Sequence, residues 1–210
     1  MIIGKFYYCI IMKKIILFFI VLVSCLTSSA QFVATKDGMT STDSCGYYIE
    51  KYANIKASIL YAKAKEYFSD MEGLKGYDTD VKNEEFSVHL LCDKAFISKK
   101  ISNMIGSYTM YMDIDVVYKI SFKDGKIRFD APVIKSMGEK LSGMRNCATW
   151  NVYLYNENYD KKLSYNIFDK NGKVVRKEKL TCENLNKWIN ENIKGVSDYI
   201  RKTKADTSNW

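Results

Sequence analysis

The sequence predicts an α+β fold in which two helices pack against one face of an antiparallel β-sheet. Residues 108–134 alternate apolar and polar side chains on both sides of Asp124-Gly125, a pair that favours the two-residue turn of a β-hairpin. Residues 54–71 and 181–202 each carry one apolar stripe at helical spacing, which needs a sheet to cover it. The chain has 210 residues, is 47% hydrophobic and contains one proline, a composition typical of globular proteins. We expect about five to eight strands.

Residues 1–30 have the pattern of a secretory signal peptide. Lys13-Lys14 precede an apolar run, and Ser28-Ser29-Ala30 resemble a cleavage site. The apolar run is shorter than the roughly 18 to 20 residues needed to span a bilayer. Residues 22–25 also resemble a lipobox, in which case Cys25 would carry a lipid and hold the domain on a membrane. We therefore expect export to the periplasm or cell surface, and favour cleavage after Ala30 over lipidation.

Met12 directly precedes the lysine pair and would serve as a start, so residues 1–11 are read as an over-extended start. Loss of residues 1–30 removes three lysines and lowers the formal charge from +8 to +5. In an exported protein we expect this mild positive charge to favour solubility or contact with anionic envelope polymers. No nucleic acid is expected as a partner.

Four cysteines remain after cleavage: Cys45, Cys92, Cys147 and Cys182. In an oxidising compartment they allow three disulfide pairings, and the sequence does not choose among them. Buried, unpaired thiols that pack as small apolar side chains are an equally good interpretation.

The segment before the domain, residues 31–46, is polar and rich in small residues, and we expect a flexible lead-in. A single domain then spans residues 47–204. It begins with a strand at residues 47–52 and a helix capped by Asn54. The stripe of this helix is Ala57, Tyr61, Ala64, Phe68 and Met71.

The next strand, residues 86–92, leads through a turn at Asp93-Lys94 into a shorter strand at 95–98. The central hairpin follows, with Lys123 facing Lys126. This register gives the apolar pairs Phe122–Ile127, Ile120–Phe129, Tyr118–Ala131 and Val116–Val133. On the other face it places Lys119 opposite Asp130, a favourable pair of charges.

The alternation of apolar and polar side chains in residues 147–179 predicts an additional antiparallel hairpin region, with Asn171-Gly172 as its turn. A C-terminal helix over residues 181–202 begins at Thr181 as N-cap. Its apolar face is Leu185, Ile189, Ile193, Val196 and Ile200. Gly195 within this face marks a kink or a point of close packing.

Several of these pieces together resemble a family of exported Bacteroidetes proteins, domain of unknown function 4468. They are the signal peptide ending in Ala-Gln, the strand at 47–52, the helix containing Ile59-Leu60-Tyr61-Ala62-Lys63-Ala64, and the strands around Lys123-Asp124-Gly125-Lys126. The resemblance covers residues 47–135. It implies a TATA-binding-protein-like fold, with a curved antiparallel sheet backed by helices. It implies no catalytic residue and no DNA binding, because the matching motifs are structural.

Asp113 and Asp115 share one face of a strand, and paired carboxylates can divide acid and base roles in a hydrolase. The alternation places them on the face away from the core, where a solvated pair is the simpler interpretation. His89, the one histidine, is most simply a surface residue, since its spacing from Cys92 puts the two on opposite faces.

Asp169, Asn171, Gly172 and Glu178 match part of a calcium-loop pattern, but Ile167 stands where the first acidic ligand is required. A hairpin turn explains these residues better. We therefore predict no metal and no cofactor.

The second hairpin region is basic, and tyrosines lie among its lysines. Charge contacts and ring stacking in this region would suit an anionic glycan or polymer. The candidate binding residues are Tyr153, Tyr155, Tyr165, Lys173 and Arg176. The competing interpretation is a lysine-rich edge that discourages aggregation.

Familiar enzyme signatures are absent from the sequence: it has no serine elbow, glycine-rich phosphate loop or Cys-x-x-Cys pair. We therefore expect a non-catalytic binding or interaction module of the bacterial cell envelope, with a glycan, an anionic polymer or another envelope protein as partner. The alternatives are a carrier of a small apolar ligand in a pocket between sheet and helix, and a hydrolase that uses Asp113 and Asp115.

Overall fold

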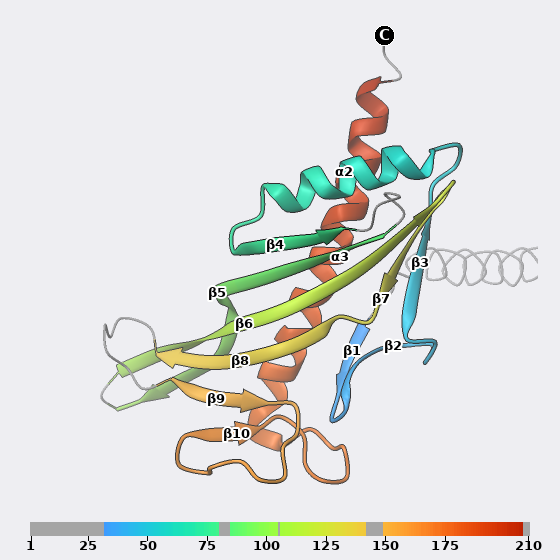
Figure 1. The fold of residues 1–210 in the computed structure, drawn as a ribbon. Helices are drawn as coiled ribbons and strands as arrows, with labels where there is room; N and C mark the ends of the chain where they lie inside the picture. The colour runs from blue at the N-terminus through green and yellow to red at the C-terminus, as the bar shows by residue number, and fades with distance from the viewer. Residues whose placement is uncertain (1–31, 80–84, 105, 142–148, 208–210) are drawn as a thin grey trace, which may run out of the picture.

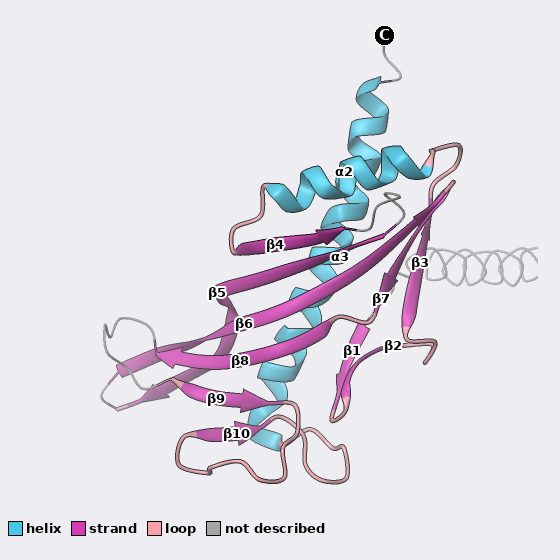
Figure 2. Cartoon of the chain, viewed as in Figure 1, coloured by secondary structure: helices cyan, strands magenta, loops and turns pink. Residues whose placement is uncertain are grey.

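The computed structural model describes residues 32–79, 85–104, 106–141 and 149–207. It shows an eight-stranded curved sheet, a two-stranded ribbon and two α-helices that contact each other and the same face of the sheet (Figures 1 and 2). The predicted α+β class with two packing helices is confirmed. No helix in these ranges is long and apolar enough to cross a membrane. The predicted signal peptide lies outside the described residues.

In chain order, the elements are β1 (Phe32–Thr35), β2 (Gly38–Ser41), β3 (Tyr47–Lys51), α2 (Ala57–Ser69), β4 (Leu74–Thr79), β5 (Glu85–Asn103), β6 (Gly106–Lys123), β7 (Lys126–Asp130), β8 (Val133–Leu141), β9 (Trp150–Tyr153), β10 (Ser164–Asn166), the 3-10 helix η1 (Arg176–Glu178) and α3 (Lys179–Thr207). The main sheet has the order β10-β9-β8-β6-β5-β4, and β7 joins β3 to the second half of β6.

The central hairpin has the predicted register close to its turn. Its pairs are Lys123–Lys126, Phe122–Ile127 and Ile120–Phe129. Beyond Asp130 the prediction is wrong. The pairs Tyr118–Ala131 and Val116–Val133 are replaced by Val117–Val133 and Val116–Ile134. Pro132 separates β7 from β8, and because proline has no N–H to continue a ladder, the chain restarts with a new register.

The charges on the outer face of the hairpin also differ from the prediction. Lys119 forms an ion pair of 2.7 Å with Glu85 on β5, and Asp130 accepts a hydrogen bond of 2.6 Å from Arg128. Glu85 is therefore the main partner of Lys119, because β5 brings a carboxylate to β6 from the opposite side. The charge of Asp130 adds a weaker attraction, and both carboxylates raise the pKa of Lys119.

The hairpin turn caps helix α2. The Asp124 carboxylate accepts a hydrogen bond of 2.8 Å from the Ala57 N–H, and the Gly125 carbonyl accepts one of 2.7 Å from the Tyr52 N–H. The predicted cap, Asn54, has φ 60 and lies in the loop before the helix. The sequence does not reveal this cap, because the capping residue Asp124 lies 67 positions away from Ala57.

Replacing Asp124 with alanine is expected to lower the free energy of unfolding by about 1 kcal/mol, because the Ala57 N–H loses its acceptor. Urea unfolding measures this difference. Asp198→Ala is the matched control, since it removes an exposed carboxylate whose pair with Lys194 on α3 is worth about 0.5 kcal/mol or less. Equal effects of the two substitutions would contradict the capping role.

The predicted flexible lead-in is instead the β1–β2 ribbon, in which Phe32 lies opposite Ser41. The Asn190 side chain accepts a hydrogen bond from the Phe32 N–H and donates one to the Phe32 carbonyl, both 2.8 Å long. Asn186, one turn earlier on α3, accepts a bond of 2.7 Å from the Ala34 N–H. The two amides therefore act on the edge of β1 as a neighbouring strand would.

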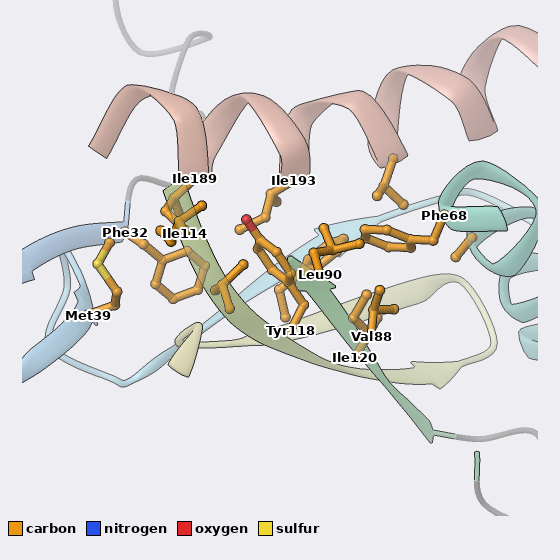
Figure 3. Close-up of a cluster of buried hydrophobic side chains, with 14 of the residues drawn as sticks. Phe32, Met39, Phe68, Val88, Leu90, Ile114, Tyr118, Ile120, Ile189 and Ile193 are labelled. Atoms are coloured by element: carbon orange, nitrogen blue, oxygen red, sulfur yellow. The ribbon is translucent and has the colours of Figure 1, made fainter. Parts of the chain in front are cut away.

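The core lies between the sheet and the two helices (Figure 3). Phe32 and Met39 of the ribbon, Phe68 of α2 and Ile193 of α3 converge on the buried side chains of β5 and β6, such as Tyr118 (Figure 3). Of the predicted α2 stripe, the buried members are Tyr61, Ala64 and Phe68, joined by Leu60. All five predicted apolar residues of α3 are buried.

Gly195 is a point of close packing and not a kink, since α3 runs unbroken through it. A Cβ atom at this position would overlap the Tyr67 hydroxyl group of α2. The helices cross closely at this glycine because it has no side chain.

Three other predictions about strands need correction. β5 is one continuous strand, in which Asp93-Lys94 forms a bulge with Lys94 at φ 52 and not a turn. β4 was not predicted, because its residues show no clear alternation. β9 and β10 pair parallel and not antiparallel, because the chain between them makes a long loop back to the same end.

The predicted turn at Asn171-Gly172 is present, but it closes a short loop with the single bridge Phe168–Val174. Thr181 lies inside α3, two residues after its start, and is not an N-cap. The described cysteines, Cys45, Cys92 and Cys182, are all free, whereas Cys147 lies outside the described residues.

Stability should decline in alkali, because Tyr118 is buried among apolar side chains and its pKa is raised above the ordinary 10.0. The raised pKa means that the folded state favours the neutral phenol, so stability is complete below pH 10 and falls as pH rises further. The loss approaches about 1.4 kcal/mol per pH unit for such a group. Urea unfolding at about pH 8 and about pH 11 should show a smaller alkaline loss in Tyr118→Phe than in the wild type. Equal losses would contradict this origin.

Candidate functional site

A groove of about 550 Å³ lies beside the first half of β8, and we call it the β8–β9 groove. It is bounded by the turn of the β1–β2 ribbon, by the start of β8, and by the end of β9 with the residues that follow it. The lining consists of residues 36–39, 131–137 and 151–155. Its volume is in the range of ligand sites in proteins.

Two of the predicted binding residues, Tyr153 and Tyr155, line this groove. Both are half-buried, so part of each side chain is open to a ligand. Lys36 and Lys135 contribute two ammonium groups to the same lining. The hydrogen bond from Lys36 to Asp37, 2.8 Å long, raises the pKa of Lys36 and keeps it charged.

Lys173 and Arg176 are exposed outside the lining. The turn at Gly172 nevertheless lies against the groove, since a Cβ atom there would contact Lys36 at 3.7 Å. Asp169 organises this turn, because its carboxylate accepts hydrogen bonds from the N–H groups of Asn171 and Lys173, 2.8 and 2.9 Å long. The structure therefore brings Lys173 near the groove and leaves Arg176 at the start of η1.

Tyr165 does not reach the groove. It lies over a second site, which we call the buried charge cluster: Lys99, Glu139 and Glu178, with Ser98 and Thr181. The Lys99 ammonium lies 3.8 Å from the centre of the Tyr165 ring. Burial, with Glu139 and Glu178 close by, raises the pKa of Tyr165 well above its ordinary value, which keeps the phenol neutral.

The buried charge cluster places one ammonium group between two carboxylates. Lys99 Nζ lies 3.3 Å from Glu139 and 3.1 Å from Glu178, whose side chains are 3% and 0% exposed. The Ser98 hydroxyl donates a hydrogen bond of 2.5 Å to Glu139. The cluster ties β5 to β8 and α3.

Sequence reasoning missed this cluster because its charges lie far apart in the chain. Glu139 reads as a surface residue of a loop, and its side chain is buried only because it extends the core face of β8 beside Met137. The alternation of β8 is the signal that would have placed Glu139 inside, but the sequence did not predict that strand.

The carboxylates Asp113 and Asp115 point away from the core, as predicted, and each has a basic partner. Asp113 pairs with Lys140 and accepts a bond of 2.9 Å from the Lys94 N–H. Asp115 lies 2.5 Å from His89 Nε2 and 3.7 Å from Lys75. His89 therefore lies at the surface, as predicted, with its side chain 40% exposed, and it is bound to a carboxylate. The pattern resembles an ion-pair network that stabilises the open face of the sheet.

A smaller hollow of about 390 Å³ lies at the β3 edge of the open face. Tyr47 and Ile49 line it with Lys123, Lys126 and Arg128. The Arg128 guanidinium stacks on the Tyr47 ring at 4.7 Å, so part of its surface is already covered.

Among the described residues, no group of three or more metal-ligating side chains gathers in one place. The space between sheet and helices, where an apolar carrier would hold its ligand, is filled by buried side chains such as Leu90, Tyr118, Ile189 and Val196. We therefore take the β8–β9 groove, whose lining includes two of the predicted tyrosines, as the candidate site.

No family model and no curated protein matches the sequence. Among solved structures, the fold is similar to that of a TBP-like protein from Parabacteroides distasonis, with a TM-score of 0.45 and 11% sequence identity. The match covers 75% of this chain and 92% of that chain.

Proposed function

We propose that the protein is an exported, non-catalytic binding module of the bacterial cell envelope, and that the β8–β9 groove is its binding site. The observation that supports this proposal is the gathering of Tyr153, Tyr155, Lys36 and Lys135 around one open groove. Aromatic rings supply large contact areas at a low cost in conformational entropy, and ammonium groups select anionic partners. The export pattern of residues 1–30 supports an envelope partner.

The Tyr153→Ala/Tyr155→Ala double variant tests the proposal. The wild-type protein should bind to an anionic glycan array or, when immobilised, capture material from an envelope extract. The variant should bind or capture about tenfold less, since an aromatic contact is worth about 1 kcal/mol beyond its buried area. Lys187→Ala on the exposed side of α3 is the control and should behave as the wild type. Equal capture by both variants, with circular dichroism showing intact folds, would contradict the groove as the site.

A further inference from the structure

We infer that the β8–β9 groove binds an extended peptide carrying acidic side chains, which adds a strand to the free edge of β8. This inference rests on the proposed function and names the class of its partner.

The first half of β8 has a strand partner on one side alone, within the part of the chain that the structure describes. Val133 and Ile134 pair with β6, whereas the pairing with β9 covers only residues 137–139. In an antiparallel ladder every second residue directs its N–H and C=O groups away from its partner. Some backbone groups of residues 133–136 therefore point toward the groove, and Val133 is 52% exposed.

The strand that would cover this edge turns away from it. Tyr153 and Leu154 accept hydrogen bonds of 2.9 Å from the N–H groups of Ile167 and Phe168, on the side of β10. The ladder between β8 and β9 ends at Met137–Val152, and the β8–β9 groove lies where the two strands are no longer paired.

The walls of the wedge suit a bound strand. A peptide in this position would form main-chain hydrogen bonds with β8, and its alternate side chains would face the two walls. Val133 offers an exposed apolar side chain on the β8 side, and Tyr153 and Tyr155 offer half-buried rings on the other. Four residues of an extended strand span about 13 Å, the length of the free edge.

The charges of the groove favour acidic side chains on the peptide. Lys36 and Lys135 are the two basic residues of the lining, and Asp37, which pairs with Lys36 at 2.8 Å, is its one carboxylate. Lys173 adds a further positive charge in the turn next to Lys36. The register shift at Lys135 and the lysines themselves are features that discourage indiscriminate pairing of an exposed edge. The acidic side chains of a bound strand would instead form ion pairs with these lysines.

Hydrogen exchange measured with synthetic peptides tests the inference. The ligand is an extended octapeptide of alternating glutamate and valine. It should slow amide exchange in residues 133–136, and N-methylation of its alternate backbone amides should weaken binding at least tenfold. Lys135→Glu should weaken the glutamate peptide about tenfold and favour a lysine–valine peptide. The matched control Lys123→Glu, exposed at the far end of β6, should change neither.

Two outcomes would overturn strand addition: binding that N-methylation leaves unchanged, or protection that falls outside residues 133–136. A parallel arm uses polygalacturonate, an anionic polysaccharide without a peptide backbone. If polygalacturonate binds and Tyr153→Ala/Tyr155→Ala abolishes its binding while the peptide fails to bind, the inference is wrong and the proposed function stands. If neither ligand binds and envelope extract yields no capture, both are wrong.

Discussion

Replacing Lys99 with methionine should lower the free energy of unfolding by about 3 to 5 kcal/mol, the largest loss we expect from one charged residue. The substitution replaces lysine with an unbranched apolar side chain that is slightly shorter, and it removes the charge. Glu139 and Glu178, whose side chains are 3% and 0% exposed, would then lie in the interior with only the exposed Lys177, 3.9 Å from Glu178, as a nearby cation among the described ion pairs. Urea unfolding monitored by circular dichroism measures the loss.

The neighbouring Lys100→Met is the control, since Lys100 is exposed on the same strand. It should change stability by less than about 0.5 kcal/mol. Adding Glu178→Gln to Lys99→Met should recover part of the loss, because one of the two buried carboxylates is replaced by a neutral amide. A loss below about 1 kcal/mol for Lys99→Met would show that the cluster behaves as a surface pair.

Replacing Gly73 with alanine should cost about 2 to 4 kcal/mol, because strain in the backbone and overlap with a neighbour add together. Gly73 has φ 88, where a side chain is disfavoured, and a Cβ atom would overlap the Leu91 carbonyl of β5. The Gly73 carbonyl also accepts a bond of 2.8 Å from the Leu91 N–H, so the two segments cannot separate cheaply.

Gly76→Ala, three residues later, is the matched control, since a Cβ atom there meets nothing within 4 Å. It should leave stability unchanged or raise it by up to about 1 kcal/mol. The thermal midpoints of the two variants compare them directly. Similar midpoints would mean that β5 shifts to make room at Gly73.

Local patterns allowed the sequence to predict the hairpin near Asp124-Gly125 and the two helical stripes. Each is decided by residues close together in the chain, where turn chemistry and periodicity act. The register beyond Pro132 was missed because a short strand pairs according to its neighbours, and the neighbours come from distant segments. The β1–β2 ribbon was missed because its order depends on the amides of Asn186 and Asn190.

The candidate site was predicted in part for the same reason. Tyr153 and Tyr155 follow β9 and reach the groove, whereas Tyr165 turns inward because parallel pairing places it beside buried Val152. Lys36 was assigned to a flexible lead-in, so its place in the groove could not be predicted. The groove is made from three segments, so predicting it requires knowing how these segments are arranged in the sheet. The sequence pattern left this arrangement open for residues 147–179.

The hydrogen bonds between Asn190 and Phe32 also affect the order in which the parts of the chain fold. These residues lie 158 positions apart, so β1 leaves the ribosome long before the helix that completes its edge. Closing so long a loop is slow compared with forming local hairpins. Docking of the ribbon on α3 should therefore be among the last steps of folding, and the β8–β9 groove, which the ribbon bounds, becomes complete only when the whole chain has emerged.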